Sequence, residues 1–483
     1  MLRLSCIVFL VLSMSATPLF SQEQPTYDPN ATAESLGLEP YVLPDDFYPN
    51  YPWDWMPVER LPHETFESSL LSTAECGYNL VGFVFPENLP LCERLGLKTF
   101  VPVKGGNCWG AITDEEWKAL TDEEIDERIR TIVADTKDYA CVVGYYLVDE
   151  PGTKSFPALA KAVAAVKKYA PGKIAYINLF PSHATVDTDD NPNSQLQTRT
   201  FTEYLERFVQ EVKPQYLSYD SYMVEYSDDM QDPGRAAFYY ADLLEVRRVA
   251  LKYDLPFWHI VSCNRLANIY ETMTPPPSPA RFAFQAYTTL AAGGRGLGWF
   301  IYHGRESALG IPDGASYSPI DSRGLRTVQW QYQQVINTHV NTLGPMMNRL
   351  TPIGVYFTTP TPVPGLPELP GKLIRKVEST ASPRGYIQKT PAFMVGEFVD
   401  PDGNEYVMMV NLSLEHSARF HMETVKDDED YVCFEKISPI DGSRSLLITD
   451  VFGEWVLPGH GILLKLNAKA SAEKSNTPSE PRR

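Results

Sequence analysis

The sequence has no excess of basic charge. Among its 483 residues, 42 Lys and Arg stand against 61 Asp and Glu, which gives a net charge of −19 at pH 7 and a pI near 4.9. Nucleic acids and anionic membrane surfaces bind proteins through basic patches, so this composition argues against both as partners. It leaves room for a small anionic substrate, which needs only a few local Lys or Arg side chains.

Long hydrophobic runs are missing too, except at the N-terminus. The stretch MLRLSCIVFLVLSMSATPLFSQEQ begins with one basic residue, Arg3, continues through an apolar core at 7–14 and reaches small residues at 15–21. A core this short is typical of a secretory signal peptide rather than of a membrane span. Residues 1–21 are therefore predicted to be a signal peptide, and the mature protein to be exported without a membrane span.

The sequence contains no CxxC pair, no HExxH motif and no cluster of histidines. Structural zinc sites and zinc-protease sites need such ligand spacings, so no metal is expected. A Gly-rich dinucleotide fingerprint is also absent after the first strand-like segments, and we expect no cofactor.

What the sequence does contain is an alternation of strand-like and helix-like segments. Apolar strand-like runs occur at 50–56, 78–85, 98–104, 142–148, 173–180, 216–222, 256–263 and 297–303. Helix-like segments lie at 64–76, 88–95, 114–136, 155–169, 201–212, 235–253, 279–292 and 325–343. Eight such units over about 300 residues predict an α/β fold, a closed (β/α)8 TIM barrel at 41–345. An open doubly wound sheet is the alternative.

From about residue 350 the long helix-like segments stop. Short strand-like runs such as 405–412 and 462–466 appear, and DPDGNEY at 400–406 contains the hairpin-type dipeptide Asp402-Gly403. Residues 350–467 are therefore predicted to be a C-terminal β-sandwich. The polar stretches at 22–40 and 468–483 are predicted to be a lead-in and a disordered tail.

The main chemical signal is CVVGYYLVDEP at 141–151, where a strand that looks buried runs into two acids and a proline. Reacting groups of such barrels lie at the C-terminal strand ends. Pro151 favours an extended conformation for Glu150. Asp149 and Glu150 would both face the axis only if the strand end bulges. Apolar neighbours would raise the pKa of Glu150, which suits a general acid. The alternative is a solvated acid at a strand end.

The same segment resembles the acid/base strand of clan A glycoside hydrolases, which typically ends Asn-Glu-Pro; Asp149 stands at the Asn position. A nearer similarity is to exported bacterial proteins described as glycoside hydrolase family 42-like or β-galactosidase-like. It is carried by IAYINLFPSHA (174–184), KPQYLSYDSY (213–222) and FQAYTTLAAGGRGLGWFIY (284–302). The likeness covers roughly 50–345, and the C-terminal part resembles the accessory sandwich of such enzymes. It implies a glycosidase with a carbohydrate substrate.

The sequence departs from that pattern at the seventh strand. Retaining clan A enzymes place a nucleophilic Glu there, whereas this strand ends Ser262-Cys263-Asn264. Strand parity instead places Asp220, in LSYDSY, on the inner face. A carboxyl gap of roughly 6.5–9.5 Å is the inverting geometry, and strands four and six are not adjacent. The sequence thus favours inversion, with Glu150 as acid and Asp220 as the base for water. The alternative is an Asp220 that is structural or positions a sugar hydroxyl.

Other side chains near the predicted strand ends are candidates for substrate binding. Parity turns Asn178 inward, and Lys104 precedes a Gly-Gly step where the backbone can approach a ligand. Aromatic faces stack on sugar rings, although the same residues also serve as core. The predicted binding set is Asp149, Asn178, Lys104, Trp53, Trp55, Trp109, Tyr222, Tyr302 and His303.

Three classes of function follow from these observations. The favoured one is an exported glycoside hydrolase that cleaves an oligo- or polysaccharide by carboxylate acid/base catalysis. The alternative is a non-catalytic glycan-binding protein on a degenerate barrel. The missing acid on strand seven favours that alternative, whereas Glu150 and Asp220 oppose it. A lyase or transferase acting on sugars is the third class.

Overall fold

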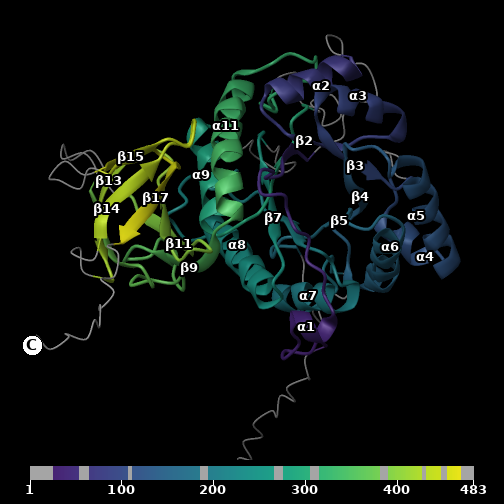
Figure 1. The fold of residues 1–483 in the computed structure, drawn as a ribbon, viewed down its shortest axis with the longest axis horizontal. Helices are drawn as coiled ribbons and strands as arrows, with labels where there is room; N and C mark the ends of the chain where they lie inside the picture. The colour runs from purple at the N-terminus through teal and green to yellow at the C-terminus, as the bar shows by residue number, and fades with distance from the viewer. Residues whose placement is uncertain are drawn as a thin grey trace, which may run out of the picture.

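Eight parallel strands stand in sequence order around a barrel (Figure 1). The computed structural model describes residues 26–53, 65–106, 111–184, 194–265, 276–304, 315–380, 390–426, 431–447 and 454–468. The barrel strands are β1 (Asn50–Pro52), β2 (Leu80–Phe83), β3 (Lys98–Pro102), β4 (Val142–Asp149), β5 (Ile174–Asn178), β6 (Leu217–Asp220), β7 (Phe257–Ser262) and β8 (Leu297–Phe300).

Backbone hydrogen bonds close this barrel. The strands pair as β2-β3-β4-β5 and as β6-β7-β8-β1. The Asn79 N–H donates to the Asn50 carbonyl at 3.2 Å, which joins β1 to β2, and the Leu179 N–H donates to the Ser218 carbonyl at 2.8 Å, which joins β5 to β6. The predicted TIM barrel is confirmed, and the open doubly wound sheet is excluded.

Helices surround the strands on the outside. They are α2 (Phe66–Glu75), α3 (Leu89–Leu95), α4 (Asp114–Ala119), α5 (Asp122–Thr136), α6 (Phe156–Tyr169), α7 (Phe201–Arg207), α8 (Arg235–Lys252), α9 (Pro279–Ala291) and α11 (Val328–Asn348). A π-helical turn, η3 (Phe208–Val212), continues α7, the turns η1 (Pro86–Asn88) and η2 (Thr153–Ser155) precede α3 and α6, and α1 (Ala33–Leu36) lies in the lead-in. No helix within the described ranges is long and apolar enough to cross a membrane.

The predicted helix at 114–136 is in fact two helices, α4 and α5. The Thr121 side chain accepts a hydrogen bond from the Glu124 N–H, and the Glu124 carboxylate accepts one from the Thr121 N–H. This capping box begins a new helix, and the acids that follow favour the positive end of its dipole.

Aromatic side chains fill the barrel interior. The Phe100 and Tyr176 rings stack at 4.5 Å, and Tyr216 and Trp258 lie 4.7 Å apart. The Tyr51 hydroxyl is 2.9 Å from the Tyr176 hydroxyl. Such rings pack a large area with few rotatable bonds, so the interior gives the strand ends a rigid base.

The C-terminal part is a β-sandwich, as predicted. One antiparallel sheet has the order β15-β14-β17-β12-β11-β9, and the other has the order β10-β13-β16. Apolar side chains from both sheets form a common core between them. The strands are β9 (Thr351–Phe357), β10 (Ile374–Thr380), β11 (Phe393–Val399), β12 (Glu405–Asn411), β13 (Ala418–Thr424), β14 (Tyr431–Ile437), β15 (Arg444–Leu446), β16 (Glu454–Val456) and β17 (Gly461–Ala468).

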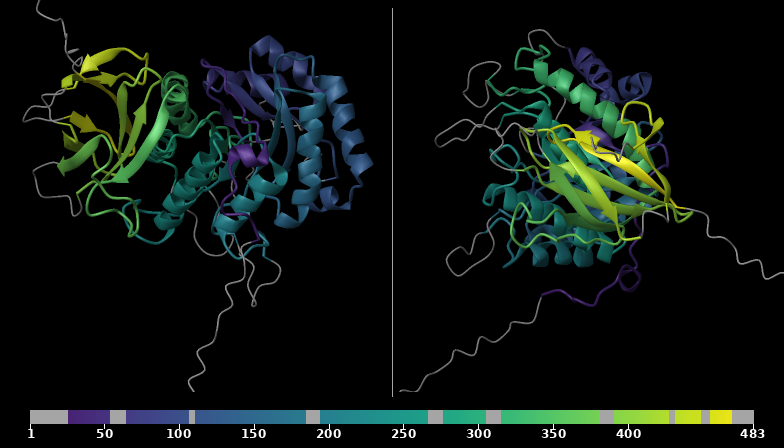
Figure 2. Two further views of the ribbon diagram at one scale, coloured as in Figure 1. Left: turned by 60° about the horizontal axis from the view of Figure 1, so that its bottom comes forward. Right: turned by 90° about the vertical axis from the view of Figure 1, so that its left-hand side faces the viewer.

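The larger sheet packs directly on α9, on one side of the barrel (Figure 2). A Cβ at Gly396 in β11 would collide with the carbonyl of Ala291, the last residue of α9. The glycine thus lets the strand backbone lie against the helix backbone. The sandwich is fixed to the flank of the barrel rather than to its mouth.

Candidate active site at the C-terminal end of the barrel

Asp149 and Glu150 come to the same site because β4 bulges before it ends. The pairing of β4 with β5 shifts register after Tyr146, which brings Asp149 opposite Asn178. Glu150 then adopts a left-handed backbone conformation with φ 46°, and its N–H donates to the Asn178 carbonyl at 2.8 Å. The extended conformation expected for Glu150 ahead of Pro151 is therefore wrong. The turn directs its side chain to the neighbouring strands.

A network of hydrogen bonds links the ends of β4, β5 and β6. The Asn178 Nδ2 donates to Asp149 Oδ1 at 3.1 Å and to Asp220 Oδ1 at 3.4 Å. The Ser218 Oγ donates to Asn178 Oδ1 at 3.0 Å and lies 3.1 Å from the Tyr176 hydroxyl. These side chains face one another inside the barrel, so the inward orientation that strand parity gave to Asn178 and Asp220 is what the structure has.

Three carboxyls share this site, and the pKa of each of them is raised. Burial, the charges of Asp220 and Asp149, and a side-chain hydrogen bond with Asp220 raise the pKa of Glu150. Burial and Asp149 raise the pKa of Asp220, while hydrogen bonds from Tyr222 and Glu150 lower it. Burial raises the pKa of Asp149, against a hydrogen bond from Asn178. Glu150 therefore acts as the donor in its bond with Asp220, and both Glu150 and Asp149 keep a partly exposed edge.

The contact between Glu150 and Asp220 corrects the separation expected from the sequence. Inverting hydrolases keep their two carboxyls roughly 6.5–9.5 Å apart, so that a water fits between them. Here the two carboxyls share a hydrogen bond. The left-handed turn carries the Glu150 side chain past the end of β5 to β6, which closes the gap. A water-activating role for Asp220 therefore does not fit this geometry.

Aromatic rings form a wall beside the carboxyls. The Tyr222 ring stacks on Phe300 with centroids 5.3 Å apart, and Asp220 lies close enough to its hydroxyl to raise the pKa of Tyr222. Trp53 meets Phe300 edge-on at 6.1 Å, and its Nε1 donates to the Tyr176 hydroxyl at 2.9 Å. Trp53 and Tyr222, both predicted as binding residues, therefore stand at the site. Phe300 was missed, although its place at the end of the eighth strand was the signal that could have found it.

Tyr302 and His303 do not join this wall. The Tyr302 hydroxyl accepts a hydrogen bond from Trp330 Nε1 at 2.9 Å, and His303 Nε2 lies 2.7 Å from Ser69 Oγ. Both side chains thus point to α2 and α11, away from the carboxyls. The reason is that β8 ends at Phe300, so the inside–outside alternation does not continue to these two residues.

The remaining predicted residues lie elsewhere. Lys104 is exposed after β3, with its Nζ 5.9 Å from the centroid of the Phe85 ring. Trp55 and Trp109 lie outside the described residues. At the end of β7, Cys263 is buried and Asn264 Oδ1 accepts a hydrogen bond from the Ile301 N–H at 3.3 Å. Within the described part of the chain, no carboxylate occupies the end of β7.

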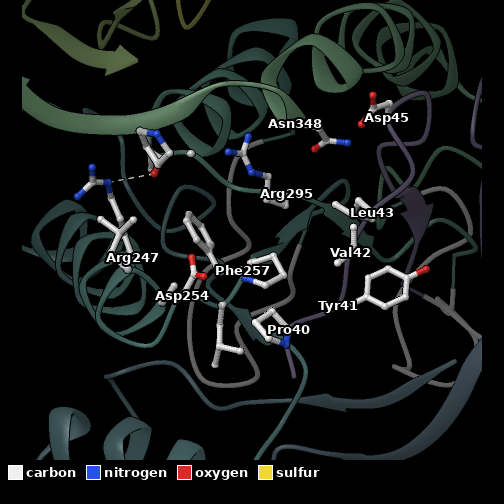
Figure 3. Close-up of a pocket in the computed structure, with 17 residues that line it drawn as sticks. Pro40, Tyr41, Val42, Leu43, Asp45, Arg247, Asp254, Phe257, Arg295 and Asn348 are labelled. Atoms are coloured by element: carbon white, nitrogen blue, oxygen red, sulfur yellow. Dashed lines mark hydrogen bonds between the residues drawn. The ribbon is translucent and has the colours of Figure 1, made fainter. Parts of the chain in front are cut away.

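A hollow of about 380 Å³ lies at the opposite end of the barrel (Figure 3). Its lining includes Tyr41 from the lead-in, Phe257 at the start of β7 and Arg295 just before β8. There the Arg247 Nε donates to the Ala292 carbonyl at 3.1 Å. Barrel enzymes react at the other face, so this hollow lies away from the candidate active site.

No known family model matches the sequence, and no curated protein matches it. Solved structures are similar in fold. A glycoside hydrolase family 5 protein from Bacteroides vulgatus has a TM-score of 0.52 and 12% identity, covering 90% of this chain and 95% of that one. A second structure, described as a glycoside hydrolase, has a TM-score of 0.52 and 10% identity, covering 87% of this chain and 93% of that one.

A β-galactosidase from the psychrophilic Marinomonas ef1 is more distant, with a TM-score of 0.43 and 10% identity. The match covers 62% of this chain and spans 61% of that enzyme. At these identities the comparisons establish the fold alone. The chain has a glycosidase-like fold, a barrel followed by a sandwich.

Proposed function

We propose that the protein is a glycoside hydrolase with Glu150 as its general acid. The observation that carries the proposal is the hydrogen-bonded pair of Glu150 and Asp220 at the C-terminal end of the barrel. A general acid must hold a proton until the leaving group needs it, and burial beside a negative charge achieves this. The glycosidase-like fold and the aromatic wall support a carbohydrate as the substrate.

In this mechanism the sugar lies against the wall of Trp53, Tyr222 and Phe300. Glu150 gives its proton to the glycosidic oxygen as the bond to the anomeric carbon breaks. A water molecule then attacks the anomeric carbon and gives its proton to the Glu150 carboxylate, which restores the acid. Asp220 holds the proton on Glu150 before the substrate binds. Its charge then stabilises the positive charge that develops on the sugar ring in the transition state.

The test is the Glu150→Gln variant, assayed on two aryl glycosides of the same sugar. Turnover of the substrate with a poor leaving group should fall by roughly 10²–10⁴-fold, because its oxygen needs a proton in the transition state. Turnover of a dinitrophenyl glycoside should fall far less, because its oxygen leaves as a stable anion. A screen of aryl glycosides and plant or algal polysaccharides first identifies the sugar.

Glu225→Gln is the matched control. Glu225 is fully buried, and neither carboxyl oxygen has a hydrogen-bond partner within the described residues. Its replacement changes a buried carboxyl outside the Glu150 cluster and should leave the ratio of the two rates unchanged. Equal losses on both substrates in Glu150→Gln would assign Glu150 to binding and contradict its role as the acid.

The second candidate is a glycan-binding protein without turnover. The observation in its favour is the end of β7, where the described residues hold Cys263 and Asn264 instead of a carboxylate. Calorimetry would then show sugar binding that survives in Glu150→Gln, with no reducing sugar released by the wild type.

We further infer that the chain is exported. The support is the basic, apolar and small-residue pattern of residues 1–21. Mass spectrometry of the protein expressed in a bacterial host should find a mature N-terminus close to residue 22 in the secreted or periplasmic fraction. An unprocessed N-terminus in the cytoplasm would contradict the inference.

A further inference from the structure

We propose that Tyr204 is a positioning residue for the acid, whose hydroxyl holds the backbone turn that aims Glu150 at its target. The proposal rests on the proposed function of Glu150. It concerns a residue that does not touch the carboxyls themselves and lies on α7, outside the ring of strands.

The Tyr204 hydroxyl lies between two strand ends. It donates to the Pro151 carbonyl at 2.7 Å, and the Phe180 N–H lies close enough to lower its pKa. Pro151 directly follows Glu150, and Phe180 lies two residues after Asn178. The hydroxyl thus holds the segment that carries the acid, beside the segment that carries Asn178.

The turn needs to be held, because Glu150 has a backbone φ of 46°. Left-handed conformations bring the Cβ of an L-residue close to its own backbone, so they persist only where the surroundings impose them. Here the Glu150 N–H is bonded to the Asn178 carbonyl on one side, and the Pro151 carbonyl is bonded to Tyr204 on the other. Tyr204 therefore acts on the Pro151–Gly152 peptide, one residue beyond the strained Glu150.

A second clamp secures the chain just beyond the turn. The Lys154 N–H donates to Gln197 Oε1 at 2.8 Å, and the Thr153 Oγ1 donates to the Gln197 carbonyl at 3.2 Å. Gly152 lies against the Gln197 amide, where a Cβ would collide with it. With the downstream segment fixed in this way, loss of the Tyr204 hydroxyl would loosen the turn without releasing the whole loop.

Tyr204 acts through Glu150 and not on the substrate. Its side chain is completely buried, with its ring 5.7 Å from Phe156 and 6.3 Å from Phe201. Proton transfer requires the acid to lie within hydrogen-bond reach of the leaving oxygen, and small displacements there cost rate. The direction of the Glu150 side chain depends on the turn, so the hydroxyl of Tyr204 controls the rate of protonation.

The test compares Tyr204→Phe with Tyr239→Phe. Tyr239 is an equally buried tyrosine on α8, whose hydroxyl lies 2.6 Å from Thr288 Oγ1, away from the carboxyls. For a glycoside with a poor leaving group, Tyr204→Phe should lower kcat about tenfold with KM within about twofold. The dinitrophenyl glycoside should be nearly unaffected. The basic limb of the pH–rate profile should move to lower pH, because a looser Glu150 is better hydrated.

Hydrogen exchange gives a readout that needs no substrate. The backbone amide of Glu150, which is bonded to the Asn178 carbonyl, should exchange faster in Tyr204→Phe than in Tyr239→Phe, since the turn is no longer held. The amides of Thr153 and Lys154, fixed by Gln197, should exchange alike in the two variants. The proposal is overturned if the two variants have the same kcat, pH profile and exchange. It is also overturned if kcat of Tyr204→Phe falls equally on both substrates and the pH profile does not move, because that pattern indicates general damage to the fold.

The two proposals can fail separately. Unchanged turnover by Glu150→Gln on the poor-leaving-group substrate would overturn the role of Glu150 as the acid, whatever Tyr204→Phe does. Unchanged exchange of the Glu150 amide in Tyr204→Phe would overturn the role of Tyr204, even in a confirmed glycosidase.

Discussion

The three carboxyls of Asp149, Glu150 and Asp220 make the site costly for the stability of the fold. Their pKa values are raised in the folded protein, by burial above all. A raised carboxyl pKa means that the folded state binds more protons than the unfolded chain. The corresponding stability is fully present below the unfolded pKa of about 4 and is lost as pH rises through the folded pKa.

A variant that lacks one of these carboxyls should therefore be more stable than the wild type, and the difference should grow as pH increases. We expect Asp220→Asn, which can still accept the Asn178 hydrogen bond, to unfold at a higher temperature than the wild type at pH 8. The expected increase is on the order of 2–4 °C for each 1 kcal/mol gained, and it should shrink towards pH 5. Differential scanning calorimetry across this range checks the sign, and a gain that is independent of pH would contradict it.

At the same scale, the sequence predicted inward orientations better than it predicted the turn. Asn178 and Asp220 were placed correctly because a strand alternates with a period of two, which a short stretch of sequence reveals. The left-handed turn at Glu150 depends on Tyr204, 53 positions from its partner Pro151, and on Gln197, 43 positions from Lys154. Contacts so distant leave no local pattern.

Among the elements, β11 contains a charge that its sequence pattern does not explain. Glu397 is fully buried in this strand, and its carboxylate accepts hydrogen bonds from the N–H groups of Lys372, Leu373 and Ile374 at 2.8, 3.0 and 2.8 Å. These residues lead into β10 of the opposite sheet. The carboxylate thus fixes the position of β10, and the sandwich depends on it.

Glu397→Gln should weaken the sandwich, because an amide nitrogen would face a backbone donor. The expected loss is about 2–3 kcal/mol for a buried, charge-assisted hydrogen-bond set. Urea unfolding followed by fluorescence measures it. Glu378→Gln is the control, since Glu378 is exposed and paired with Lys376 on the surface, and it should change stability by less than about 0.5 kcal/mol. Equal effects of the two variants would remove the structural role given to Glu397.

The succession of elements was largely readable from the sequence, because each barrel strand is apolar and each helix follows it. Residues 50–56, the least regular of the predicted strands, do contain β1. The division of 114–136 into α4 and α5 was missed although its signal is local, Thr121 followed three residues later by Glu124. The packing of the barrel elements against the sandwich could not be predicted from the sequence, because contacts between two domains leave no periodicity in either.

For the whole molecule, that packing brings two histidines together where the sandwich meets the barrel. The Tyr287 hydroxyl from α9 lies 3.0 Å from Nδ1 of His339 on α11. The His339 and His460 rings are 6.1 Å apart, and His460 belongs to the turn before β17. Burial, with some contribution from His460, lowers the pKa of His339 to about 4. Burial also lowers the pKa of His460.

This interface should weaken in acid. A histidine pKa below its unfolded value of about 6.5 means that the unfolded chain binds more protons, so stability is lost as pH falls from about 6.5 towards 4. The unfolding temperature of the wild type should therefore fall more steeply between pH 7 and 4.5 than that of His339→Gln, which cannot take up the proton. His421→Gln, a change at an exposed histidine on β13, is the control and should follow the wild-type curve. Parallel curves for the wild type and His339→Gln would show that the histidine pair does not couple the two domains to pH.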